Sequence, residues 1–133
     1  FQRSFHGQGV APTAEQLSDS LLEQLAARIE GLLGMARKSG QVESGSNAVL
    51  ASLRKNGKYA LLILSDDISE AIGSKLKTAA IQQNIPVFKM LEKNRLGQIL
   101  GKGERSVAAI AVGPLANAIL AELQRLAEMV REN

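Results

Sequence analysis

Three short and almost continuous apolar runs, separated by segments with helical periodicity, constrain the fold of this chain more than any other feature of its sequence. The runs are residues 59–64, 87–90 and 107–112. A short apolar run without alternation is typical of a strand that is buried on both faces. Because helical patterns lie before, between and after these runs, the sequence predicts an α/β domain with its sheet between helical layers.

Capping and terminating residues set the boundaries of the predicted helices. Thr13, with Gln16 three residues later, has the pattern of a capping box, and apolar residues then recur at helical spacing until Gly40 ends the pattern. Gly31 and Gly34 are candidate break points that would divide this helix in two.

Shorter elements follow the first helix. Residues 41–43 predict an edge strand, and residues 44–47 (Ser-Gly-Ser-Asn) supply the N-cap of a helix that Asn56 and the following glycine close. Ser69 caps the next helix, and Pro114 occupies the first turn of the last one.

The length of 133 residues predicts one domain, which we expect to span residues 14–133. With 45% hydrophobic residues, it has enough apolar side chains to fill a core without covalent cross-links. Residues 1–13 are rich in Gly and Gln, and we expect them to be a linker or the tail of a preceding domain. Since the sequence has neither a membrane-spanning run nor a signal pattern, we expect a cytoplasmic protein.

The residue types that the chain lacks exclude several kinds of chemistry. There is no Cys, which excludes disulfides and cysteine metal sites, and His6 is the only His. A catalytic triad or a His-rich metal site requires imidazoles held by the fold, whereas His6 lies in the predicted linker. We therefore expect no catalytic residue, no metal and no cofactor.

Positive charge is concentrated in the middle of the chain. The net charge is +3, but residues 36–110 alone carry twelve basic and six acidic side chains. This distribution favours a polyanion partner, with a solvated surface of mixed charge as the alternative. Aromatic residues are scarce, and Tyr59 and Phe88 are expected in the core. A nucleic acid would therefore contact loops and helix ends and would not stack on a sheet face.

Three segments next to the predicted strands are candidate binding elements. Residues 44–47 place a helix N-terminus, whose backbone N–H groups attract anions, directly after a strand. Asp66 and Asp67 follow a buried strand, where functional groups often lie; capping of the next helix is the alternative. Residues 101–105 form a flexible basic loop suited to a phosphate backbone, or an ordinary connection from helix to strand.

Residues 97–103 superficially resemble the phosphate-binding loop of nucleotide triphosphatases. However, the glycines are one residue too close together, and Gly103 stands where a Ser or Thr would hold magnesium. The segment also follows a short predicted helix around Leu96, whereas that loop follows a strand. The pattern therefore argues against a nucleotide triphosphatase.

Five segments, taken in order, resemble one known family. They are residues 34–40 (Gly-Met-Ala-Arg-Lys-Ser-Gly), 44–47, 61–67, 84–87 (Asn-Ile-Pro-Val) and 96–105. This ordered set, which covers about residues 30–120, is similar to the kink-turn-binding ribosomal protein family, and most of all to its bacterial YlxQ-like members. In addition, Phe1-Gln2-Arg3-Ser4-Phe5 is similar to the tail of the small basic YlxR domain that precedes a YlxQ-like domain in some bacteria.

The resemblance implies a three-layer α-β-α sandwich with a four-stranded mixed sheet, and RNA binding without catalysis. The implied partners are structured RNA, with ribosomal RNA as a candidate, and ribosome-associated proteins in translation. By correspondence with the family, RNA contacts the start of the second helix, the residue after the central strand and the loop at residues 101–105. Together with basic residues chosen by charge, the predicted RNA-binding residues are Arg37, Lys38, Gly45, Ser46, Asn47, Lys58, Asp66, Gly101, Lys102, Gly103, Glu104 and Arg105.

The chain departs from the family pattern at three positions. Members that recognise the kink-turn carry Glu, Lys and Lys where this chain has Ala48, Ala51 and Ala60. The departure predicts general RNA binding without specific kink-turn recognition. Two alternatives stay open: a protein-interaction or dimerisation module of the same fold, and an accessory domain related to those of ribosomal RNA methyltransferases.

Overall fold

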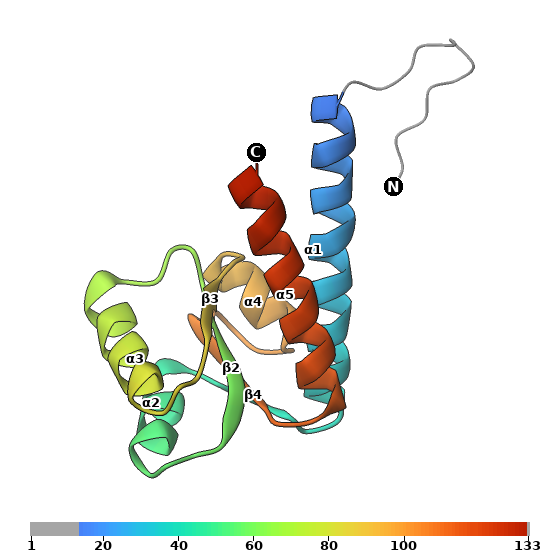
Figure 1. Cartoon of the computed structure of the whole chain (residues 1–133). Coiled ribbons are helices and arrows are strands. Elements are labelled where there is room, and N and C mark those ends of the chain that lie inside the picture. Colours follow the sequence, from blue (N-terminus) through green and yellow to red (C-terminus); the bar gives the residue numbers. More distant parts are fainter. Residues whose placement is uncertain (1–13, 133) are drawn as a thin grey trace.

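The computed structural model describes residues 14–132 as helices and strands in nearly strict alternation (Figure 1). The elements are α1 (Ala14–Lys38), β1 (Val42–Ser44), α2 (Ser46–Arg54), β2 (Tyr59–Leu64), α3 (Glu70–Gln82), β3 (Val87–Lys89), α4 (Lys93–Ile99), β4 (Val107–Ala111) and α5 (Pro114–Glu132). The strands predicted at residues 59–64, 87–90 and 107–112 are confirmed to within one residue. The predicted linker at residues 1–13, with the capping residue Thr13, lies outside the described residues.

The four strands form one mixed sheet in the order β1-β4-β2-β3. β2 and β3 run parallel, whereas β4 is antiparallel to both β1 and β2. The register pairs Ser44 with Ala108, and Leu64 with both Val107 and Lys89. The C-terminal ends of β1, β2 and β3 therefore meet the start of β4 at one end of the sheet, which we call the loop end.

Helices cover both faces of this sheet, which confirms the predicted three-layer α-β-α sandwich. α1, α4 and α5 enclose one core with the sheet, and α2 and α3 enclose a second core on the other face (Figure 1). The central strand β2 serves both: Leu61 and Ile63 belong to the first core, and Leu62 and Leu64 to the second. All four side chains are fully buried, which explains why their sequence run is continuous and does not alternate.

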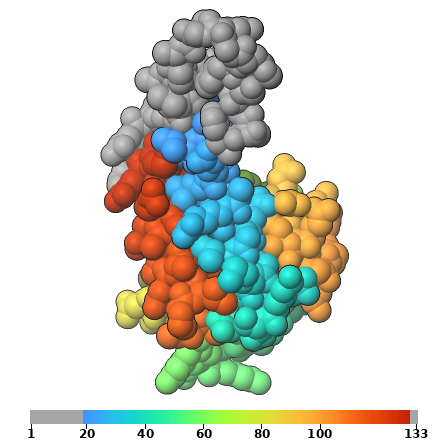
Figure 2. All heavy atoms as spheres, turned by 90° about the vertical axis from the view of Figure 1, so that its right-hand side faces the viewer, coloured from blue at the N-terminus to red at the C-terminus, as the bar shows by residue number. Residues whose placement is uncertain are grey.

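α1 is a single helix, so the expected break at Gly31 or Gly34 is wrong. Ile29, Leu33 and Ala36 are fully buried along one face of the helix, against the first core. The burial of these side chains outweighs the roughly 0.5–1 kcal/mol that each mid-helix glycine costs. Figure 2 shows α1 between α5 on one side and the α4 region on the other.

The ends of the elements follow the predicted chemistry in most places. Gly40, with φ of 71°, ends α1, and the Gln41 N–H donates to the Ala36 carbonyl across it. Ser69 caps α3 by accepting the Ile72 N–H at 3.3 Å.

None of the helices described between residues 14 and 132 has an apolar stretch long enough to cross a bilayer.

Candidate nucleic-acid interface

Backbone hydrogen bonds join four loops at the loop end of the sheet. The Ser65 N–H donates to the Ser106 carbonyl at 2.9 Å, and the Gly45 N–H donates to the Val107 carbonyl at 3.2 Å. The Asp66 N–H donates to the carbonyl of Leu91 at 2.6 Å. Segments that are up to about sixty residues apart in the chain therefore form one surface.

The N-terminus of α2 lies on this surface. Gly45 occupies the N-cap position with φ of 99°, and no side chain caps the helix. The N-cap therefore lies within residues 44–47, as predicted, but the capping residue is the glycine of this segment. A positive φ favours glycine at position 45, and glycine has no side chain with which to cap. The first-turn N–H groups of Ser46 and Asn47, with the helix dipole behind them, are left to attract an anion.

The two aspartates after β2 differ in what they contact. Asp66 is exposed, whereas Asp67 Oδ1 accepts the backbone N–H of Lys93 at 2.9 Å. Asp67 thus caps α4, and not α3, the next helix in the chain. Partial desolvation acts to raise the pKa of Asp67, but the hydrogen bond from the Lys93 amide and the Lys93 charge outweigh it, so the pKa lies below its ordinary value.

The loop at residues 101–105 folds back on α4 and is not the loose connection that its composition suggests. The Lys102 N–H donates to the Gly97 carbonyl at 2.8 Å, and the Arg105 N–H donates to the Lys93 carbonyl at 3.2 Å. A Cβ atom at position 97 would lie 1.9 Å from the Gly103 carbonyl oxygen. The glycines that resemble a phosphate-binding loop therefore allow two backbone segments to approach each other closely.

The basic residues at this loop have different surroundings. Arg105 is half-buried, and its Nε donates to Ser44 Oγ at 3.3 Å, while its Nη1 donates to the Glu104 carbonyl at 2.9 Å. Arg105 thereby links the loop to the end of β1. Lys102 is exposed and belongs to none of the ion pairs of the described residues. The Arg37 guanidinium also reaches this loop, because a Cβ atom at Gly101 would lie 3.3 Å from Arg37 Cζ.

Two predicted RNA-binding residues belong to the opposite end of the sheet. Lys58 precedes Tyr59, which pairs with Ala111 at the end of β4. Lys38 lies in the last turn of α1, three residues before Gln41, whose carbonyl accepts the Ala111 N–H at 2.9 Å. The structure therefore gathers at the loop end Arg37, residues 45–47, Asp66 and residues 101–105, but not Lys38 or Lys58.

The three departures from the family pattern have unequal surroundings. Ala48 and Ala51 are exposed on α2, so charged side chains at these positions would reach solvent. Ala60 is partly buried and packs against the first core. A lysine side chain at position 60 would begin among the packed side chains of the first core. Ala48 and Ala51 are therefore the two positions at which the charged side chain of the family would simply be exposed.

Sequence reasoning missed two contributors to the loop end. The backbone N–H of Lys93 donates to the Asp67 carboxylate. The two residues are 26 positions apart in the chain, so no local sequence pattern indicates this contact. Leu91 adopts a left-handed conformation with φ of 68° and accepts the Asp66 N–H. Because a bulky residue rarely takes that conformation, its identity gave no signal for it.

The geometry defines a class of protein: a small α-β-α module that presents a helix N-terminus and a glycine-rich basic loop at one end of its sheet. Residues 27–120 match the model of the Ribosomal protein L7Ae/L30e/S12e/Gadd45 family. The match covers most of the chain, and the chain belongs to this family. The predicted membership is thereby confirmed.

Two curated relatives carry the match across much of the chain. RNA-binding protein YlxQ of Bacillus subtilis is 29% identical over 92 residues, which are 69% of this chain and 91% of the relative. Large ribosomal subunit protein eL8 of Methanobrevibacter smithii is 26% identical over 110 residues, which are 80% of this chain and 89% of the relative. One relative is named as an RNA-binding protein and the other as a ribosomal protein, in agreement with the prediction that the chain is not an enzyme.

A solved structure shares the fold. A protein of unknown function from Bacillus halodurans superposes with a TM-score of 0.68 and 28% sequence identity, and the match covers 74% of this chain and 98% of that one.

Among the described residues, no group of His, Asp and Glu side chains could hold a metal ion.

Proposed function

We propose that this chain is a non-enzymatic RNA-binding protein that holds structured RNA at the loop end of its sheet. The observation that carries the proposal is the convergence of the uncapped α2 N-terminus with the loop at residues 101–105, joined through the hydrogen bond from Arg105 to Ser44. Family membership and the names of two relatives, an RNA-binding protein and a ribosomal protein, support the same function.

Each group at the loop end has a distinct part in this binding. The first-turn N–H groups of α2 donate to a phosphate or a base edge, and Lys102 neutralises a neighbouring phosphate. Arg105 ties the loop to β1, and the Arg37 guanidinium lies beside Gly101, so the donors are held in place before RNA arrives. A pre-ordered surface loses less conformational entropy on binding.

We further propose that the RNA is ribosomal or otherwise connected with translation, and that binding takes place in the cytoplasm beside ribosome-associated proteins. The support is the ribosomal name of the family and of the archaeal relative. Kink-turn specificity is not part of the proposal, since Ala48 and Ala51 offer neither a carboxylate to a base nor an ammonium group to a phosphate.

Salt-dependent binding tests the proposal. The chain is titrated against a fluorescent bulged hairpin RNA, and affinity is measured by anisotropy over a range of salt concentrations. If three to five phosphates are neutralised, log affinity falls against log salt with a slope of about −2 to −4. Lys102→Glu weakens binding several-fold, whereas Glu128→Lys, an exposed change on α5, does not weaken it. Absence of binding at low salt would refute RNA binding and favour a protein-interaction module.

A further inference from the structure

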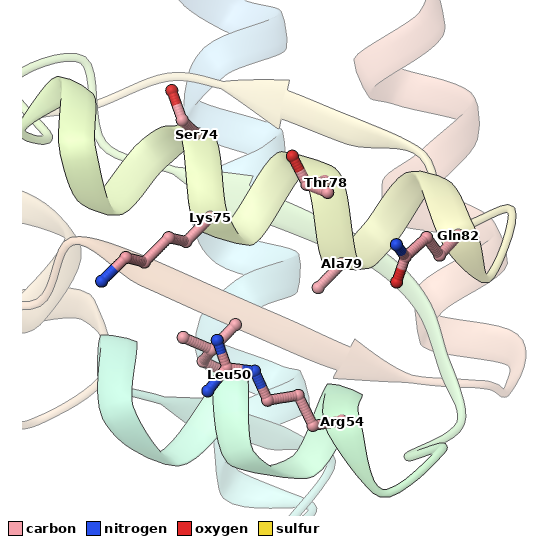
Figure 3. A pocket seen from close by; sticks show the side chains of 7 residues that line it. All are labelled: Leu50, Arg54, Ser74, Lys75, Thr78, Ala79 and Gln82. Atoms are coloured by element: carbon pink, nitrogen blue, oxygen red, sulfur yellow. The ribbon is translucent and has the colours of Figure 1, made fainter.

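A groove of about 370 Å³ lies between α2 and α3, on the helical layer that faces away from α1 and α5. Its walls come from both helices, and the residues that matter for its chemistry are Leu50, Arg54, Ser74, Lys75, Thr78 and Gln82. Figure 3 shows Arg54 and Lys75 extending from the two helices into the space between them. The proposed function does not use this groove.

The polar groups of the groove suit an anion. Arg54 and Lys75 supply a guanidinium and an ammonium group, Ser74 and Thr78 supply hydroxyl groups, and no carboxylate lines the groove. Among the residues described, neither Arg54 nor Lys75 belongs to an ion pair. The salt bridges there all lie within the layer formed by α1, α4 and α5. Cationic donors beside hydroxyl donors are the usual partners of a phosphate oxygen.

The groove leads away from the loop end. Both helices begin at that end, and at their C-terminal ends the Gln83 side-chain amide donates to the Leu53 carbonyl and ties α3 to α2. Ser46, Leu50 and Arg54 are spaced four residues apart and so lie along one side of α2. From Ser46 to Arg54 is roughly 12 Å of helix, the length of about four stacked nucleotides.

We propose that the α2–α3 groove binds the sugar-phosphate backbone of the RNA that occupies the loop end, with a phosphate between Arg54 and Lys75. The inference rests on the proposed function and extends it from a single end of the sheet to a continuous track. Leu50 gives the groove an apolar floor against which a ribose packs.

A charge-matched comparison tests the groove. Arg54→Ala with Lys75→Ala removes two cations from the groove, and Lys55→Ala with Lys77→Ala removes two cations that do not line it. With the bulged hairpin RNA, the groove pair weakens binding at least five-fold and makes the salt slope shallower by about 1 to 2. The control pair stays within two-fold. Arg54→Lys with Lys75→Arg keeps the charges and retains most of the affinity.

The absence of cysteine permits a second measurement that leaves both cations in place. A single thiol is introduced by Thr78→Cys inside the groove, or by Ile81→Cys on the same helix outside it, where Ile81 is 70% exposed. Hairpin RNA slows alkylation of the first thiol and not of the second.

The outcomes separate the two proposals. If the unmodified chain binds no RNA, the proposed function falls and the groove assignment falls with it. If the chain binds RNA and Lys102→Glu weakens binding, but both charge pairs behave alike and Thr78→Cys is not protected, the function stands and the groove assignment is overturned.

Discussion

The two helical layers of this protein use their charges in different ways. α1, α4 and α5 together carry seven basic and seven acidic residues, whereas α2 and α3 carry three basic residues and one acidic residue. In the first layer, Arg28 and Arg125 both pair with Glu122, and Arg95 pairs with Glu30. No ion pair of the described residues involves α2 or α3.

This difference shows which surface is available to a polyanion. In the first layer the opposite charges neutralise one another and join helices that pack together, as α1 and α5 do in Figure 2. In the second layer the cations remain exposed and belong to no ion pair of the described residues, and they lie along the helices that lead away from the uncapped N-terminus of α2. The net charge of the whole chain therefore understates the positive potential on one face.

The largest expected effect concerns the support that α4 gives to the loop end. Gly97→Ala would place a Cβ atom 1.9 Å from the Gly103 carbonyl oxygen, so the loop or α4 must move. We expect the free energy of unfolding, measured with urea, to fall by about 2–4 kcal/mol, and RNA binding to weaken.

The matched control is Gly31→Ala in α1, where no atom beyond the adjacent residues and the helix's own backbone lies within 4 Å of the added Cβ. This change should raise stability by about 0.5–1 kcal/mol, because alanine is the better helix former. Equal effects of the two substitutions would show that close packing of the glycine loop does not hold the loop end together.

Adding charge to the second layer should create specificity. Ala48→Glu with Ala51→Lys introduces a carboxylate and an ammonium group on the exposed side of α2. A charged hydrogen bond is worth about 1.5–3 kcal/mol, so we expect at least a tenfold preference for a kinked RNA over a plain duplex. The unmodified chain should show little preference in the same anisotropy assay.

A control pair places the same charges on the first layer, with Ala121→Glu and Ala127→Lys on exposed positions of α5. It should leave the preference unchanged. Tight and selective binding of the kinked RNA by the unmodified chain would mean that other residues perform the recognition.

Removing charge from the first layer should affect stability and not binding. Glu122 is only 7% exposed and meets two arginines, so Glu122→Gln should lower the free energy of unfolding by about 1 kcal/mol. Glu128→Gln, an exposed change on the same helix, should alter it by less than about 0.5 kcal/mol. A marked loss of RNA affinity in Glu122→Gln would contradict the division between the layers.

The smallest expected effect concerns the Asp67 cap. Because the folded state lowers the pKa of Asp67, the ionised carboxylate contributes stability above its ordinary pKa of 3.8, and this contribution is lost as pH falls through the lowered value. Asp67→Asn keeps an acceptor for the Lys93 N–H but loses the charge. The urea concentration at which half of the variant is unfolded should therefore lie slightly below that of the unmodified chain at neutral pH. The two values should become equal at acidic pH. A constant difference between the two proteins across the pH range would contradict a contribution from the ionised Asp67 cap.

The sequence by itself determined the elements and their order. Continuous apolar runs fixed β2 and β4, and Gly40, Ser69 and Pro114 marked helix ends, because burial on two faces and backbone capping are local requirements. The family resemblance, which rests on short motifs, predicted the four-stranded mixed sheet. It also predicted that the loops after β1 and β2 and before β4 form the binding site.

Only the tertiary structure decided which residues share a surface. The strand order β1-β4-β2-β3 brings Ser44, Ser65 and Ser106 to one end of the sheet and leaves Lys58 at the other, although all are near strand ends in the sequence. The Asp67 cap of α4 likewise joins segments far apart in the chain, and the Arg37 guanidinium likewise lies beside the distant Gly101. The physical reason is that a loop rich in Lys, Arg and Gly has the same sequence pattern whichever end of the sheet it occupies. The direction of each strand in the assembled sheet determines which of these residues face the same ligand.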